Sequence, residues 1–247
     1  MPPALEIARR RPTSRQGRRR HSLVQAGNHT YAEEADLPGT IPVFPLTGAL
    51  LLPGGQLPLN IFEPRYVKMI DDALAGDRII GMVQPSLDGG RRSDGEPKLC
   101  EVGCMGRMTS IAESGDGRYI ISLQGVARFR IIEELSTRMP YRCCRVAAFL
   151  ADLDAGAGET EVDRDGLLRA FRRFCDANQM EADWDSIRRA SNETLVNALS
   201  MMSPYGPAEK QALLEASDLR TRAETLVAMT EIALARDGDE DGPTTLQ

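Results

Sequence analysis

The order of its secondary-structure signals constrains this fold most, because strand-like segments come first along the chain and helix-like segments follow. Four segments between Leu99 and Leu150 are rich in β-branched and other apolar residues: LCEVGCMGRMTSI, RYIISLQG, VARFRIIEE and YRCCRVAAFL. Turn signals separate them at residues 115–117, at Gly125 and at Met139-Pro140. From residue 160 onward, apolar residues recur at helical spacing instead. Strands followed by helices predict an α+β fold in which the two kinds of element are segregated.

The segment before these strands mixes extended and helical patterns. TIPVFPL (40–46) is predicted to be extended, and its prolines suit an edge strand or the beginning of a strand. GQLPLNIF (55–62) alternates as a strand does, RIIGMVQP (78–85) is typical of a buried strand, and residues 88–97 are predicted to form a loop. Between them, Pro64 suits the first position of a helix whose apolar stripe continues to Gly76.

The second half of the chain carries clear signals for the starts of helices. Ser191 and Asp218 are predicted N-caps, and Pro207 suits the first turn of a short helix after the break SPYGP. Two apolar stripes are predicted to face a core, namely Leu168, Phe171, Phe174 and Cys175, and then Leu195, Val196, Leu199 and Met202.

Charge is distributed unevenly along the chain. Residues 1–38 carry seven arginines against four carboxylates, a balance of +3, so the remaining residues carry −6 − 3 = −9. The pattern predicts a disordered arginine-rich tail over 1–38, a β-rich subdomain over 39–151, a linker over 152–159, a helical bundle over 160–236 and an acidic disordered tail over 237–247. A cytoplasmic location is expected, because the five cysteines are an odd number without an apolar secretory signal, and no apolar run is long enough to span a membrane.

The residue inventory argues against most enzyme classes. The two histidines, His21 and His29, fall in the predicted tail, so the predicted body lacks the imidazole of Ser-His and Cys-His systems and of most zinc sites. None of the three lysines lies in a phosphate-binding GxxxxGK[ST] loop. The cysteines are expected to be buried thiols, and the carboxylate pairs Asp71-Asp72 and Glu133-Glu134 to be structural or solvated. We therefore expect no enzymatic activity, no cofactor and no metal site.

Glu63 and Arg65 flank Pro64 next to an apolar segment and could be taken for a catalytic pair. We instead expect a structural role for Glu63-Pro64-Arg65-Tyr66 at a junction between strand and helix. The Glu63 carboxylate is predicted to cap the first turn of the helix, and Arg65 to pair with an acidic group of the β-rich subdomain.

Several ordered blocks give the chain a recognisable family likeness: IPVFPL, LLPGG, LPLNIFEPRY, MIDDAL, IGMVQP, VGCMGRM, GRYIISLQGVARFRI, PYR and LVNALSMMSPYGPAEKQALLEASDLRTRAETLVAM. Together they cover about residues 40–235 and resemble the N-terminal domain of Lon proteases. The resemblance implies a PUA-like β pseudo-barrel followed by a helical bundle. In full-length Lon this region precedes an ATPase module and a Ser-Lys protease module, and it helps engage unfolded or tagged substrates. Neither module is recognisable here, so a free-standing recognition domain is expected.

The residues and the resemblance together predict a protein-binding module of protein quality control, either a binder of unfolded or extended polypeptide or an adaptor. A sheet edge or an apolar groove would suit such clients. A separately encoded Lon protease is a further candidate partner, and no pattern specifies an oligomeric state. An RNA-binding PUA-like module and a histidine-free enzyme are the alternatives, but the acidic body disfavours nucleic acid. The candidate contact residues, where they are exposed, are Leu50, Leu51, Leu52, Leu57 and Met105; burial in the core is the alternative for each and the more common fate of such apolar residues.

Overall fold

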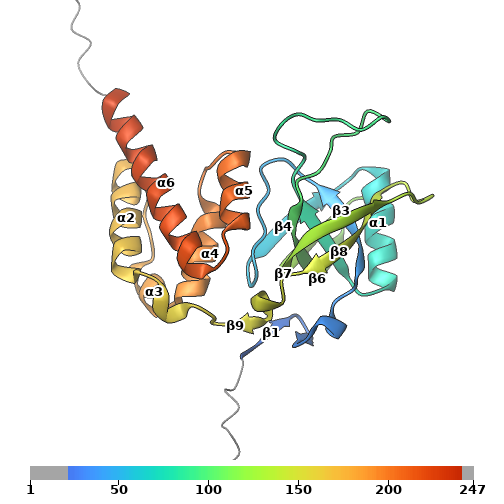
Figure 1. Cartoon of the computed structure of the whole chain (residues 1–247), viewed down its shortest axis with the longest axis horizontal. Coiled ribbons are helices and arrows are strands. Elements are labelled where there is room, and N and C mark those ends of the chain that lie inside the picture. The colour runs from blue at the N-terminus through green and yellow to red at the C-terminus, as the bar shows by residue number, and fades with distance from the viewer. Residues whose placement is uncertain (1–21, 241–247) are drawn as a thin grey trace, which may run out of the picture.

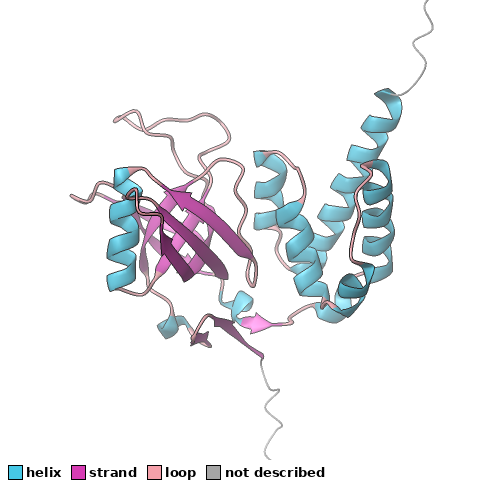
Figure 2. Ribbon diagram, turned by 180° about the vertical axis from the view of Figure 1, so that it is seen from behind, coloured by secondary structure: helices cyan, strands magenta, loops and turns pink. Residues whose placement is uncertain are grey.

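The chain forms a β-rich subdomain and a helical subdomain, as the segregated signals predicted. A computed structural model describes residues 22–240. In Figure 1 the strands gather on one side and the later helices on the other, and Figure 2 shows the same division from behind. No helix within this range is long and apolar enough to cross a membrane.

Six strands form the sheet of the β-rich subdomain; five of them close into a ring, and β4 is added to it along β7. They are β3 (Thr40–Pro45), β4 (Gln56–Ile61), β5 (Ile79–Val83), β6 (Val102–Glu113), β7 (Tyr119–Leu135) and β8 (Arg142–Ala148). Their order is β4-β7-β6-β5-β3-β8, and a further pairing of β7 with β8 closes the ring. Helix α1 (Pro64–Ala75) lies on the side away from the later helices (Figure 1).

Two expectations about these strands need revision. TIPVFPL is extended as predicted, but of its two alternatives the edge strand is excluded, because β3 pairs in parallel with β5 and antiparallel with β8. The predicted turn at Gly125 does not exist either, since β7 runs through it without a break. A Cβ atom at Gly125 would lie 2.0 Å from the carbonyl oxygen of Leu52, so this glycine permits a close backbone approach rather than a turn.

Residues 22–38 are ordered, which corrects the predicted tail. Strands β1 (Ser22–Ala26) and β2 (His29–Tyr31) form a hairpin, and the 3₁₀ turn η1 (Glu34–Asp36) follows. The hairpin is stable because Val24, Ala26 and Tyr31 are buried in the ring's own core. The predicted linker is also structured, with 3₁₀ turns η2 (Leu150–Leu153) and η3 (Glu159–Glu161) around β9 (Asp154–Ala155), which pairs with β1. Residues 1–21 and 241–247 of the predicted tails lie outside the described range.

The helical subdomain contains α2 (Arg164–Ala177), α3 (Trp184–Arg189), α4 (Asn192–Met202), α5 (Pro207–Glu215) and α6 (Leu219–Glu240). The predicted starts are confirmed: the Ser191 hydroxyl accepts the Thr194 amide at 3.1 Å, and the Asp218 carboxylate accepts that of Thr221 at 2.7 Å. Helix α3 lies in the region predicted to be helical, although its bounds were not specified. One buried apolar cluster contains residues of the ring, such as Leu52 and Leu123, together with Leu195 and Leu213 of the helices. The two subdomains therefore share a core.

Candidate functional site

The predicted contact residues divide into two groups. Leu51, Leu52 and Met105 are at most 1% exposed and cannot meet a partner, so for these three the alternative of core burial holds and the contact role is excluded. Leu51 and Leu52 are buried because residues 50–52, which we call the Leu-Leu-Leu segment, pack onto the ring, where Leu51 approaches Gly106 and Leu52 approaches Gly125. Met105 of β6 is buried in the core of the ring itself. Leu50 is also largely buried and Leu57 is half-buried, but both line a cavity.

This cavity has a volume of about 620 Å³ and lies between the two subdomains. We call it the β4–α4 groove, because residues of β4 and of α4 both line it. Its other walls come from β1, from the loop before β4 and from the start of α5. The apolar lining consists of Leu23, Val24, Ala49, Leu50, Pro53, Leu57, Pro58, Ala155, Ala198, Met201 and Met202. Mostly apolar walls with a few polar groups are typical of binding sites.

Polar contacts between the subdomains fix the walls of the groove. The Asn197 amide nitrogen donates to the carbonyl oxygen of Pro53 at 3.0 Å, and its oxygen accepts from Arg222 at 3.0 Å. On the other wall, the Lys210 ammonium donates to the carbonyl oxygen of Gly48 at 2.9 Å. Because these buried partners would lose their hydrogen bonds if the subdomains separated, we expect the groove to be largely pre-formed.

The rim of the groove carries two exposed apolar side chains that the sequence did not single out. Met202 is 79% exposed, although the helical stripe predicted that it would face the core. The stripe fails there because Met202 is the last residue of α4, beyond the turns that pack on the ring. Leu23 of β1 is 52% exposed and was missed because it follows the arginine-rich segment. Methionine side chains adapt to irregular apolar partners, so a methionine rim suits varied ligands.

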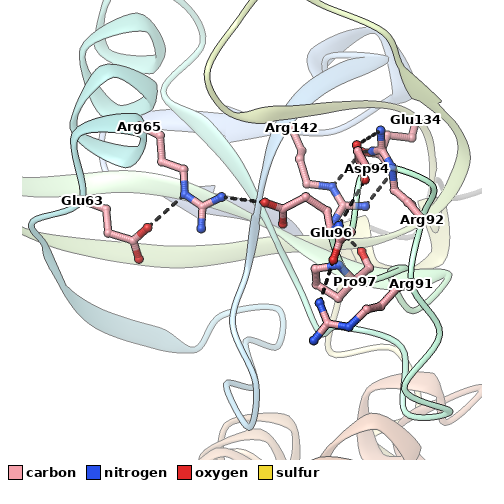
Figure 3. Close-up of polar contacts among 10 residues, drawn as sticks. Glu63, Arg65, Arg91, Arg92, Asp94, Glu96, Pro97, Glu134 and Arg142 are labelled. Atoms are coloured by element: carbon pink, nitrogen blue, oxygen red, sulfur yellow. Dashed lines mark hydrogen bonds and ion pairs between the residues drawn. The ribbon is translucent and has the colours of Figure 1, made fainter.

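Glu63 and Arg65 form an ion pair with each other at the start of α1. The Glu63 carboxylate does not cap α1, which corrects our prediction. Instead, the backbone carbonyl oxygen of Glu63 accepts the amides of Tyr66 and Val67, each at 2.9 Å. The carboxylate instead accepts from Arg65 Nε at 3.0 Å, and Arg65 Nη1 reaches Glu96 at 3.5 Å (Figure 3). The predicted pairing of Arg65 with an acidic group of the β-rich subdomain is thus confirmed. All three side chains are partly exposed, and the set links the start of α1 to the loop before β6.

The same loop is held by a second ion-pair cluster. Arg142 donates through two nitrogens to the Glu134 carboxylate, each at 2.7 Å, and through a third to the carbonyl oxygen of Pro97 at 2.7 Å (Figure 3). Arg92 also pairs with Glu134. Partial burial acts to raise the pKa of Glu134, but hydrogen bonds and charge from Arg142 and Arg92 outweigh it and hold that pKa below its usual value. The lowered pKa keeps Glu134 ionised as the partner of Arg142 and Arg92.

Among residues 22–240, cysteine and histidine side chains are the remaining candidates for metal binding or nucleophilic chemistry. No group of three or more His, Cys, Asp or Glu side chains in this range is placed to hold a metal ion. Burial raises the pKa of the Cys144 thiol to about 12 and also raises that of Cys104, so both thiols are protonated and unreactive. His29 belongs to β2 rather than to a tail, and its ring packs edge-on against Tyr31 at 4.7 Å.

Known structures share this architecture. The Lon N-terminal domain protein from Xanthomonas campestris aligns with 76% of this chain and 97% of its own, with a TM-score of 0.56 and 22% sequence identity. The N-terminal domain of Mycobacterium avium complex Lon protease aligns with 78% of this chain and 98% of its own, with a TM-score of 0.58 and 18% identity. At such low identity these likenesses concern the fold, which agrees with the ring and helical subdomain described above.

Sequence comparison points to the same family. Lon protease 2 of Myxococcus xanthus is 28% identical over 203 residues, which is 78% of this chain and 24% of that protein. Lon protease of Desulfosudis oleivorans is 32% identical over 190 residues, 75% of this chain and 23% of that protein. The chain thus spans about a quarter of the length of these relatives. The profile of the ATP-dependent protease La (Lon) substrate-binding domain matches residues 40–231, so that the ring, α1 and nearly all of the helical subdomain fall within it. From this match, and from the fold it covers, we conclude that the chain belongs to the Lon substrate-binding domain family.

Proposed function

We propose that this protein is a non-enzymatic polypeptide-binding module and that it holds unfolded or extended clients in the β4–α4 groove. The apolar groove with its exposed methionine rim is the observation that carries the proposal. A family described as substrate-binding domains supports a protein ligand. Leu50 and Leu57 remain candidate contact residues, joined by Leu23, Met201 and Met202. Delivery of the client to a separately encoded Lon protease is the adaptor form of the proposal.

The polar part of the groove argues against RNA as the ligand. Lys210 is the one cationic side chain of the lining, and its ammonium already donates to Gly48. RNA binding relies on several free cations and on aromatic side chains that stack with bases. The described lining contains neither, whereas its leucine and methionine side chains suit apolar residues of a polypeptide.

The first prediction concerns Met202. We expect Met202→Glu to weaken binding of a reduced and alkylated, permanently unfolded protein about tenfold or more. Burial of a methionine side chain contributes about 1.5–3 kcal/mol, and the new carboxylate would be desolvated by a client. Fluorescence anisotropy with the labelled unfolded protein and the full chain would measure the affinity.

A matched control uses a second exposed methionine. Met180 is 50% exposed, follows α2 and does not line the groove. Met180→Glu adds the same charge and should leave the affinity unchanged within about twofold. Equal weakening by both variants would show a non-specific charge effect, and no weakening by Met202→Glu would place the client elsewhere.

A further inference from the structure

Strand β4 has one open edge. It occupies the end of the six-stranded order and pairs, among the described strands, with β7 alone. The Gly125 amide donates to the carbonyl oxygen of Gly55 at 2.9 Å, just before Gln56 pairs with Gln124. Because hydrogen-bonded and non-hydrogen-bonded pairs alternate in an antiparallel ladder, Leu57, Leu59 and Ile61 bond to β7. The backbone groups of Gln56, Pro58 and Asn60 therefore face the open edge.

Pro58, the middle one of these three residues, agrees with this alternation of inward and outward backbone groups. Pro58 has no N–H to donate, and proline within a strand is tolerated where the missing N–H would face away from the neighbouring strand. The open edge thus presents the N–H groups of Gln56 and Asn60 and the carbonyl oxygens of all three residues. Within residues 22–240, no backbone hydrogen bond outside the ladder reaches any of them.

The open edge borders the β4–α4 groove. Gln56, Leu57 and Pro58 line it on one side, and Ala198 and Met201 of α4 line it on the other. A chain lying along the edge would therefore pass between the two subdomains and place every second side chain among the apolar residues of the lining.

The outer face of β4 and β7 beside the edge is uncharged. The residues of these two strands that share this face through their pairing register are Gln56, Pro58, Asn60, Ile120, Ser122 and Gln124. Farther from the edge, β6 adds Ser110, Ala112 and the cation Arg107, whose guanidinium donates to Asn28, to the Tyr31 hydroxyl and to the carbonyl oxygen of Asp77. Ile120 is 54% exposed, and Phe62 just beyond β4 is 62% exposed. A charged side chain docked on this face would lose water without gaining an ionic partner, so the charge pattern fits an uncharged segment.

We propose that a client is held as an added β-strand along β4. Its main chain exchanges hydrogen bonds with Gln56 and Asn60 and donates an N–H to the Pro58 carbonyl oxygen, while alternate apolar side chains enter the β4–α4 groove. The substrate class is an uncharged extended segment with apolar residues at every second position. This inference rests on the proposed function and specifies how the same groove selects its ligand.

The edge is a poorer match for a second copy of itself. Two β4 strands paired about a two-fold axis at Pro58 would bring two Pro58 carbonyl oxygens face to face without a donor between them. Buried carbonyl groups without a donor are destabilising, and proline on an edge strand is a known means of preventing such self-pairing. A client with an N–H at that position satisfies Pro58, so a foreign strand is the better occupant.

Two substitutions at one position separate the backbone donor from the side chain. The probe is a fluorescein-labelled ten-residue peptide of alternating valine and threonine, added to the full chain. We expect Gln56→Pro, which loses the outward N–H, to bind it about fivefold more weakly than Gln56→Ala, which keeps that N–H and lacks the same side chain. Pro58→Ala supplies a third donor and should bind more tightly. Thermal melting would verify that each variant is folded.

N-methylated peptides test the proposal on the unaltered protein. One peptide is methylated at every threonine N–H and a second at every valine N–H. Because only alternate N–H groups of the client face β4, methylation should abolish binding of one peptide and leave binding of the other unchanged. Loss with the threonine set would indicate an antiparallel client, and loss with the valine set a parallel one.

The outcomes distinguish the two proposals. If both methylated peptides bind like the parent while Met202→Glu still weakens the parent, the groove binds clients but strand addition is wrong. If Met202→Glu has no effect on the parent peptide, the proposed function itself fails at this groove. A wild-type dimer in sedimentation that Gln56→Pro dissociates would replace the client by a second copy and overturn the inference.

Discussion

Glu193 illustrates how a single residue couples the groove to the linker. Its carboxylate accepts the Gly156 amide at 2.9 Å, just after β9, and the residue lines the groove at the start of α4. Burial is the main reason that the pKa of Glu193 is raised, and the nearby Glu159 carboxylate adds to the shift, whereas the hydrogen bond from Gly156 and the charge of Arg222 oppose it. The folded state therefore holds the Glu193 proton more tightly than the unfolded chain does.

A pH-dependent stability difference follows for Glu193→Gln. A raised pKa in the folded state means that the protonated form contributes stability at acidic pH, and that this contribution is lost as pH rises through the folded pKa. Glutamine keeps an acceptor for Gly156 but has no proton to lose. Relative to wild type, the variant should gain stability as pH rises from about 4 to 7. Urea unfolding at both ends of this range would measure the difference; a difference that is constant with pH would show that Glu193 does not titrate as described.

Among the elements, β7 shows why a glycine can be misread. Its 17 residues pair with β4 and β6 at the start and with β8 at the end, so the strand joins both ends of the sheet order. Gly125 lies where the turn before β4 crosses β7, with the carbonyl oxygen of Leu52 almost in contact. A glycine in a strand-like sequence has the same appearance whether it allows a turn or a close approach.

Substitution of Gly125 should therefore be costly. In Gly125→Ala the new methyl group meets backbone atoms of Leu52, which cannot move without displacing the Leu-Leu-Leu segment (residues 50–52) from the core. We expect a loss of about 1–3 kcal/mol or more of unfolding free energy in urea titrations. Gly39→Ala is the control, because a Cβ there meets nothing within 4 Å, and it should be neutral. A wild-type midpoint for Gly125→Ala would show that the turn before β4 is freely movable.

The helices were more predictable than the sheet contacts. Pro64, Ser191, Pro207 and Asp218 each begin or cap a helix as expected, because capping depends on a few neighbouring residues. The β1–β2 hairpin was not predicted, although Gly27-Asn28 is a typical two-residue turn. The arginine-rich composition of the preceding residues led to the prediction of a disordered tail over 1–38. The groove could not be predicted from spacing, because Leu23, Leu57 and Met201 are far apart in sequence and meet only in the folded chain.

At the scale of the whole molecule, buried polar contacts join the ring to the helices. Arg128 of β7 pairs with Asp152 through two contacts of 2.9 and 2.8 Å and donates to the carbonyl oxygen of Leu214 at 3.0 Å. Gln84 donates to Pro207 and to the Gln211 side chain, at 2.9 and 3.1 Å. Separation of the subdomains would take the acceptors on Leu214, Pro207 and Gln211 away from the buried donors of Arg128 and Gln84, and buried donors without acceptors are costly. The shared apolar cluster adds to this coupling.

The two subdomains should therefore unfold together. Trp184, the single tryptophan, reports on the helical subdomain through its fluorescence, and alkylation of the buried thiols Cys104 and Cys144, read by mass spectrometry, reports on the ring. We expect both probes to give the same urea midpoint, as in a two-state transition. Gln84→Ala leaves buried partners of Gln84 without hydrogen bonds and should lower both midpoints equally, by about 1–3 kcal/mol in free energy. Thiol labelling at lower urea than the fluorescence change, or a shift of one midpoint alone, would mean that the ring and the helices are separate cooperative units; the groove between them would then open and close instead of being pre-formed.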